Sequence, residues 1–278
     1  RNVMEKLLIK TVGWYINISS YISKHHASKK ALTLFQTPRQ GRVTDKQSSF
    51  LNTAVKQTLK HNNLSIMTYQ WKGTKETILL VHGWESNAHR WKSLVNSLTK
   101  KGYNLIALDA PAHGASGGIR FNALLYAEFI HIVAKHFNAQ VVIGHSVGGM
   151  ASVLFQHKYN IKSVEKLILM GAPSEFKDVL ERYYDLLGYN KRTRTQINLS
   201  IINLFGKAPE DFSTAKFSKQ ISSQGLIIHD TEDAIIPYND AILINKDFSD
   251  SQLITTTGFG HSLNNDTVNN FIYQFIDD

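Results

Sequence analysis

The chain contains no cysteine among its 278 residues. This absence excludes disulfide bonds, a thiolate nucleophile and a metal site built on thiolates. It is typical of a protein kept in a reducing compartment, so we expect a cytoplasmic location, with the periphery of a membrane as the alternative. No apolar run is long enough to span a bilayer, because lysines interrupt the longer ones. The sequence also starts at Arg1 and not at Met, as expected when the natural start lies upstream.

Acidic residues are in the minority, with 22 Asp and Glu against 31 Lys and Arg, which gives a formal net charge of +9. Such a balance can indicate nucleic acid, an anionic membrane surface or an acidic substrate. The basic residues are scattered, however, and no basic stripe with interleaved aromatic residues occurs. We therefore expect no nucleic-acid partner and interpret most of the charge as a solvated surface.

The first 60 residues have a helical pattern, and we expect residues 1–60 to form an N-terminal helical extension. The first apolar stripe has helical spacing and consists of Met4, Leu7, Leu8, Thr11, Val12 and Tyr15. A second stripe, which we also expect to be helical, consists of Leu51, Ala54, Val55, Thr58 and Leu59. The first helix is interpreted as packing on its own domain. The alternative is a peripheral membrane or partner contact through residues 1–22.

Beyond residue 64, short apolar runs alternate with amphipathic helices. The runs are continuous, as is typical of strands buried on both faces of a parallel sheet, and they lie at 78–81, 105–108, 141–143, 167–170, 226–228 and 253–254. Alternating strands and helices predict a three-layer α/β/α sandwich. Its core is expected in two parts, residues 61–173 and residues 223–278.

The segment between these two parts, residues 174–222, is longer than one crossover connection needs. Apolar residues at helical spacing begin at Phe176 and again at Ile197, which predicts two helices. The segment follows the carboxyl end of a strand, the side on which open α/β sheets bind ligands. We therefore predict a helical cap.

The sequence Gly-His-Ser-Val-Gly at 144–148 follows one predicted strand and opens a helix. A strand-to-helix turn this sharp holds its central residue in a strained conformation, and glycines two residues on either side let strand and helix approach. The turn lifts the Ser146 hydroxyl to a helix N-terminus, where negative charge is favoured. Ser146 is the predicted nucleophile.

A serine hydroxyl needs a base to remove its proton, and twelve histidines are present. His261 is the candidate because it follows the last predicted strand and precedes the last helix. A carboxylate must fix the tautomer of this histidine. We choose Asp233 from the loop after the run at 226–228, and expect Asp230 and Glu232 to cap the chain or face solvent. The resulting order is Ser146, Asp233, His261.

The oxyanion formed by attack on a carbonyl group needs donors aimed at it. The backbone N–H of Val147, next to the nucleophile, is one candidate, and that of Trp84, after the run at 78–81, is the other. We place four further residues in the substrate pocket: His82, His145, Met150 and Phe176. For Met150 and Phe176, the alternative is that the side chain is buried in the core. This chemistry requires no metal and no organic cofactor.

These motifs resemble the α/β-hydrolase superfamily over residues 64–278. Beside the serine motif, the chain has His82-Gly83 after a strand and, at 109–116, a sequence similar to the family's D-x-x-x-H-G-x-S loop. The resemblance implies an eight-stranded, mostly parallel sheet with a helical cap inserted after the sixth strand. Ser146 departs from the family members that have an Asp nucleophile. The chain also lacks the H-G-G-G loop of some esterases, which argues against bulky tertiary-alcohol esters.

The expected reaction is hydrolysis of a small-molecule carboxylic ester through an acyl-enzyme on Ser146. A thioesterase, a C–C hydrolase and a perhydrolase use the same three residues, and the sequence does not separate them, because cap and loops build the acyl pocket. A non-catalytic ligand-binding or signalling module on the same fold is the alternative from a different class.

Overall fold

The computed structural model describes residues 3–278, except for the side chains of residues 3, 5 and 6. The first two residues of the predicted contact segment 1–22 thus lie outside the described residues. The chain divides into two compact units. The helical unit consists of the chain up to Thr37 together with Glu175–Ser213, and the sheet unit consists of Pro38–Ser174 and Thr214–Asp278.

An eight-stranded sheet forms the centre of the sheet unit, with the order β1-β2-β4-β3-β5-β6-β7-β8. The β1–β2 and β2–β4 pairs are antiparallel, and all other pairs are parallel. The predicted mostly parallel sheet is therefore confirmed. The strands are β1 Val55–His61, β2 Leu64–Trp71, β3 Thr77–Val81, β4 Asn104–Leu108, β5 Val141–His145, β6 Lys166–Met170, β7 Gln224–Asp230 and β8 Ser251–Thr256.

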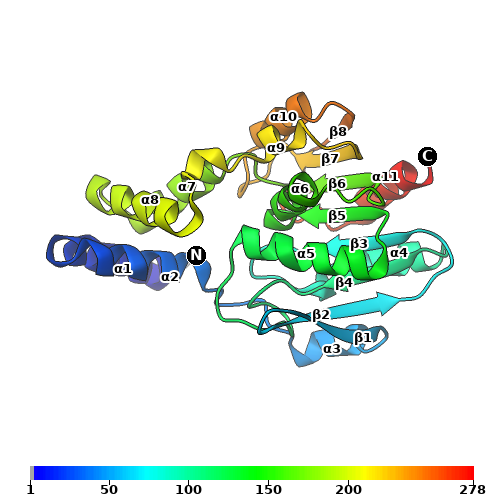
Figure 1. The fold of residues 1–278 in the computed structure, drawn as a ribbon, viewed down its shortest axis with the longest axis horizontal. Helices are drawn as coiled ribbons and strands as arrows, with labels where there is room; N and C mark the ends of the chain where they lie inside the picture. Colours follow the sequence, from blue (N-terminus) through cyan, green and yellow to red (C-terminus); the bar gives the residue numbers. More distant parts are fainter. Residues whose placement is uncertain (1–2) are drawn as a thin grey trace. The chain divides into compact units, whose positions relative to one another are not determined.

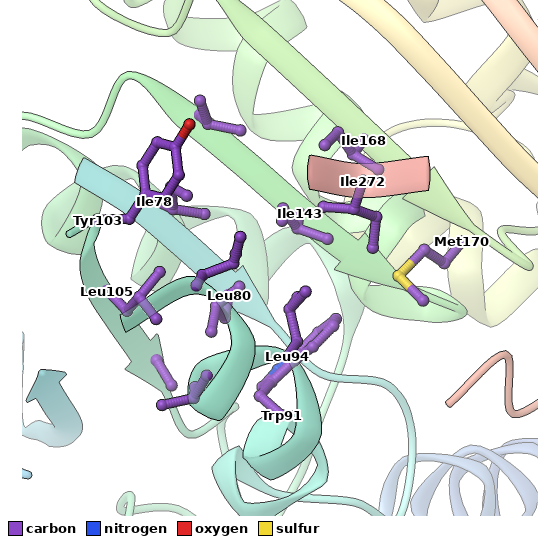
Figure 2. Close-up of a cluster of buried hydrophobic side chains, with 14 of the residues drawn as sticks. Ile78, Leu80, Trp91, Leu94, Tyr103, Leu105, Ile143, Ile168, Met170 and Ile272 are labelled. Atoms are coloured by element: carbon purple, nitrogen blue, oxygen red, sulfur yellow. The ribbon is translucent and has the colours of Figure 1, made fainter. Parts of the chain in front are cut away.

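Helices cover both faces of this sheet, so the predicted three layers are confirmed (Figure 1). One face is covered by α3 Asp45–Leu51, α4 Lys92–Thr99 and α11 Asp266–Asp277, with the short η1 Ala88–Trp91 before α4. The other is covered by α5 Ala123–Phe137, α6 Val147–Tyr159 and α10 Tyr238–Asp247, with α9 Thr214–Ser218 beside α6 and α10. Figure 2 shows part of the core under η1, α4 and α11: Trp91 and Leu94 lie near Leu80 of β3, and Ile272 lies near Ile143 of β5.

The strand β1 corrects one expectation, because the stripe from Leu51 to Leu59 was predicted to be helical. The helix α3 ends at Leu51, and residues 55–61 pair with β2 from Val55 opposite Gln70 to His61 opposite Leu64. The hairpin turn holds Asn62 at a φ of 50°, a conformation that Asn tolerates better than most residues. The apolar residues of a short, mostly exposed strand can coincide with helical spacing, so the pattern could not exclude this pairing.

The helical unit joins two stretches that lie far apart in the sequence. Its helices are α1 Val3–Ile22, α2 Lys24–Gln36, α7 Phe176–Leu187 and α8 Lys191–Phe205, followed by the short η2 Pro209–Asp211. Side chains of Ser23 and Asn190 cap the N-termini of α2 and α8. The core contains Ile16, Ala27, Ala31, Leu32, Leu180, Tyr184, Leu187, Tyr189, Ile197 and Ile201. The predicted helical insertion after the sixth strand thus exists, and its helices share a core with α1 and α2.

Candidate active site

Ser146 occupies a strained turn between β5 and α6. Its φ is 56° and its ψ is −128°, in a region that residues with a side chain rarely adopt and that clusters at functional sites. Glycine is required on either side of the serine, because a Cβ atom at either position would clash with neighbouring backbone atoms. A Cβ atom on Gly148 would lie 2.4 Å from the carbonyl oxygen of His82, and one on Gly144 would lie 2.6 Å from the Cα of Gly149. The close approach of β5, α6 and the loop after β3 thus fixes the serine.

The side chains of Ser146, His261 and Asp233 form a chain of hydrogen bonds. The Nε2 atom of His261 lies 3.0 Å from the Oγ of Ser146, and its Nδ1 lies 2.7 Å from the Oδ2 of Asp233. Because a carboxylate can only accept, Nδ1–H donates to Asp233, and Nε2 is free to accept the serine proton. The three residues come from the carboxyl ends of β5, β7 and β8. This arrangement can carry a proton from the hydroxyl to the imidazole.

Asp233 accepts three hydrogen bonds and lies beside the ring of His229, whose Nε2–H donates to the Ile236 carbonyl at 2.9 Å. Its Oδ1 accepts the backbone N–H groups of Ile235 and Ile236 at 2.8 and 2.9 Å. Its Oδ2 accepts from His261 and lies 3.3 Å from the Nε2 of His229. Burial alone would raise the pKa of the Asp233 carboxyl, but these interactions, led by those with His229 and His261, bring the pKa below its usual range. Asp233 is therefore ionised at neutral pH and fixed in orientation.

His145 supports His261 from behind. Its Nε2–H donates to the backbone carbonyl of His261 at 2.8 Å. Burial, together with the positive charge of Arg90, holds the pKa of His145 well below that of an ordinary histidine, so the ring is neutral. The sequence analysis expected a pocket residue here. The structure places the side chain, nearly fully buried, against the backbone that carries the candidate base.

Asp230 is a residue of the site that the sequence analysis did not recognise. It was expected to cap the chain or face solvent, but it is fully buried. Its Oδ2 accepts from the Thr256 hydroxyl at 2.7 Å and from the Phe259 N–H at 2.9 Å, and its Oδ1 accepts from the Glu232 N–H at 2.9 Å. Asp230 thus ties the loop after β7 to the loop that carries His261. Glu232 is exposed, as expected.

His82, the residue directly after β3, fixes the loop that follows this strand through two hydrogen bonds to the backbone. His82 is 0% exposed. Its Nδ1–H donates to the Gly83 carbonyl at 2.7 Å, and its Nε2 accepts the Ala110 N–H at 2.9 Å. Burial lowers the pKa of His82 to about 3. His82 is therefore not on the wall of the pocket, as expected from the sequence, because both of its ring nitrogens form hydrogen bonds with the backbone. The physical reason is that the strand end where it lies is packed on every side.

The loop at 109–116 supports the loop after β3 from the other direction. The Nε2 of His113 accepts the Glu85 N–H at 2.9 Å. The carboxylate of Asp109 accepts the N–H groups of Ala88 and Ala115 and the Tyr69 hydroxyl, all within 2.9 Å. These contacts explain why His and Asp occur in this sequence motif: their side chains form hydrogen bonds with backbone N–H groups and do not serve to bind substrate.

The two candidate oxyanion donors lie on either side of Ser146. Val147 is the first residue of α6, so its N–H has no acceptor within the helix. The loop carrying Trp84 runs against the serine, since a Cβ atom on Gly83 would lie 3.0 Å from the Ser146 Cβ. The Trp84 ring packs edge-on against His113 and Phe121. Both N–H groups therefore belong to backbone segments adjacent to the hydroxyl.

The last two predicted pocket residues occupy different units. Met150 lies on α6, one turn beyond Ser146, and is almost completely buried. Phe176 begins α7 in the helical unit, where its ring packs against Phe35 and Phe212. Met150 therefore lies in the packed interior of the sheet unit, one helical turn beyond Ser146, and Phe176 packs against the core of the helical unit.

Comparisons with known proteins agree with this fold. A family model described as the alpha/beta hydrolase fold matches residues 76–200. The AB hydrolase superfamily protein YisY of Bacillus subtilis is 22% identical over 247 residues, which cover 73% of this chain and 92% of YisY. A non-heme haloperoxidase of Rhodococcus erythropolis is 30% identical over 108 residues, which cover 37% of this chain and only 39% of the relative.

A solved structure has the same fold. The meta-cleavage product hydrolase of Pseudomonas fluorescens IP01 matches 80% of this chain and 97% of its own, at 17% identity and a TM-score of 0.60. The chain therefore has the α/β-hydrolase fold, and the model of that family matches its residues 76–200.

Proposed function

We propose that this protein is a serine hydrolase that cleaves a carboxylic ester through an acyl-enzyme on Ser146. The observation that carries the proposal is the continuous hydrogen-bonded chain from the Ser146 Oγ through His261 to Asp233, at 3.0 and 2.7 Å. As the Oγ attacks the ester carbonyl carbon, its proton passes to the Nε2 of His261. The imidazolium then donates that proton to the leaving alcohol, which departs as the acyl-enzyme forms.

The second half of the reaction repeats the first with water. His261 takes a proton from water, the hydroxide adds to the acyl carbon, and the proton returns to the Oγ as the carboxylic acid leaves. Asp233, held ionised by its donors, stabilises the imidazolium formed in each half. The backbone N–H groups of Val147 and Trp84 are the proposed donors to the oxyanion.

The test is turnover of a series of p-nitrophenyl esters of increasing acyl length. The Ser146→Ala variant should lose on the order of 10³-fold or more in kcat/KM. Ser152→Ala is the matched control, because Ser152 lies on the same helix and its hydroxyl only donates to the Gly148 carbonyl. A fluorophosphonate probe should label Ser146, as located by peptide mass spectrometry. Equal turnover by the wild type and Ser146→Ala would refute the proposal.

The same screen separates the alternatives. Thioesters of matched acyl length test thioester hydrolysis, and turnover of a carboxylic acid that depends on added peroxide tests perhydrolysis. A vinylogous diketone tests C–C cleavage. Binding of an acyl compound without turnover, together with absence of probe labelling, would instead support a ligand-binding module on this fold.

A further inference from the structure

The helix α1 is apolar on two opposite faces. One face is buried in the core of the helical unit, where Ile16 is fully covered and Ile9 and Val12 pack around it. The opposite face is exposed, and it carries Met4, Leu7, Leu8, Trp14, Tyr15, Ile18, Tyr21 and Ile22. Spacings of three, four and seven residues place all eight on one side of the helix. We call this set the exposed face of α1.

The exposed face runs from Met4 to Ile22 with Thr11 between Leu8 and Trp14, and its apolar side chains are strongly accessible. Leu8 is 64% exposed and Ile22 is 86% exposed. A shallow groove of about 350 Å³ lies at its C-terminal end, where Trp14, Tyr15 and Ile18 contribute to the lining. Single exposed apolar residues are common on proteins, but a stripe of them along a whole helix marks an interaction surface. Packing on its own unit, the favoured interpretation of this helix from sequence, accounts for only one of its two apolar faces.

Cations surround the exposed face. The ammonium of Lys30 donates to the Tyr15 hydroxyl at 3.2 Å and lies 4.5 Å from the ring centre. The guanidinium of Arg192 lies 5.0 Å from the centre of the Tyr21 ring, and Lys10 is exposed on α1 itself. Between residues 7 and 44 the chain contains no Asp or Glu. The surface around the exposed face therefore combines apolar, aromatic and positive groups.

This combination matches the boundary of an anionic bilayer better than it matches a protein partner. Aromatic rings with a polar tip and lysines with a long stem place their apolar parts at acyl chains and their polar ends among headgroups. Each cation near such a surface adds about 1 kcal/mol of attraction, and no Asp or Glu between residues 7 and 44 opposes it. Among residues 3–278, no helix combines the length and apolar character needed to cross a bilayer.

We propose that the exposed face of α1 docks the helical unit onto the surface of a bilayer that contains anionic phospholipid, with α1 lying in the plane of the interface. The contact is independent of the reaction proposed for Ser146. It is measured with the full chain and vesicles of phosphatidylcholine, with and without phosphatidylglycerol, by co-sedimentation and by the emission shift of Trp14.

The decisive variant replaces Leu8 and Ile22 by serine. The control variant has serine at two other positions of the same residue types, Leu204 and Ile119. Their side chains lie outside α1 and are similarly exposed, at 65% and 76%. The Leu8→Ser, Ile22→Ser protein should lose on the order of tenfold or more in vesicle partitioning, while the control binds like the wild type. Urea unfolding shows that both variants remain folded.

Two further measurements test the docking proposal: the dependence of vesicle binding on charge, and the self-association of the protein. Binding should weaken as salt is raised and should be stronger to the mixed vesicles than to phosphatidylcholine alone. Equal binding to both vesicle types would overturn the anionic assignment. A wild-type dimer in sedimentation velocity that becomes monomeric in the Leu8→Ser, Ile22→Ser variant would overturn the docking proposal and make this face an interface between two copies. Unchanged vesicle binding by that variant would overturn it as well.

Discussion

Replacing Asp230 by asparagine should both destabilise the protein and slow its reaction. The buried carboxylate accepts three hydrogen bonds, from Glu232, Thr256 and Phe259. An amide of the same shape can accept at only one of its two positions, so its NH₂ group faces at least one donor. Each charge-assisted bond contributes about 1.5–3 kcal/mol, and an unsatisfied buried N–H costs a similar amount. We expect a loss of about 2–3 kcal/mol in the free energy of unfolding.

The effect on the reaction follows from the loop that Asp230 holds. Phe259 is two residues before His261, whose Nε2 must stay near 3.0 Å from the Ser146 Oγ. Displacement of a reacting group by about 1 Å can cost on the order of 10²-fold in rate. We therefore expect kcat for a p-nitrophenyl ester to fall by about 10- to 100-fold, with KM nearly unchanged, at a temperature where the variant is folded.

The assay combines urea unfolding with ester turnover and with the rate of fluorophosphonate labelling. Glu232→Gln is the matched control, because Glu232 is the exposed acid two residues along the same loop. It should change the free energy of unfolding by less than about 0.5 kcal/mol and leave kcat as it is. If Asp230→Asn unfolds at the wild-type urea concentration and turns over at the wild-type rate, the role assigned to this carboxylate is refuted.

Two further predictions concern the packing around the serine. Burial holds the pKa values of His82 and His113 below that of an unfolded histidine, about 6.5, so their contribution to stability is complete above that pH and is lost as pH falls. The free energy of unfolding should drop by up to about 1.4 kcal/mol per histidine for each pH unit below it; a flat urea midpoint between pH 7 and pH 5 would contradict this. Gly148→Ala should cost about 3 kcal/mol or more, because its Cβ would overlap the His82 carbonyl. Gly206→Ala, with no atom within 4 Å, should cost only the strain of its positive φ, about 1–2 kcal/mol; equal thermal shifts for the two variants would contradict the packing argument.

Local patterns were sufficient where a feature depends on neighbours in the sequence. The turn at Ser146 could be predicted because a strand, two glycines and a helix start lie within a few residues. The strands at 78–81 and 141–143 could be predicted because burial on both faces leaves a continuous apolar run. The positions of His261 and Asp233 followed from the loops after two such strands.

Local patterns failed where the partner lies far away in the chain. The roles of His82 and His145 depend on backbone groups of Ala110 and His261, which are distant in the sequence and whose orientation no pattern specifies. Asp230 differs from Asp233 only in the direction of its side chain, toward Thr256 and Phe259 rather than toward the imidazole. The sequence does not distinguish the roles of the three acids in this short loop, because only the folded backbone determines where each side chain points.

The sequence by itself determined the α/β class of the fold, the strands at its centre and the three side chains at the serine, because these depend on periodicity and on motifs of a few residues. Only the tertiary structure decided that α1 and α2 share a core with α7 and α8, and that one apolar face of α1 is left exposed. The physical reason is that periodicity reveals which side chains avoid water. It does not reveal what covers them, and that depends on contacts between segments more than a hundred residues apart.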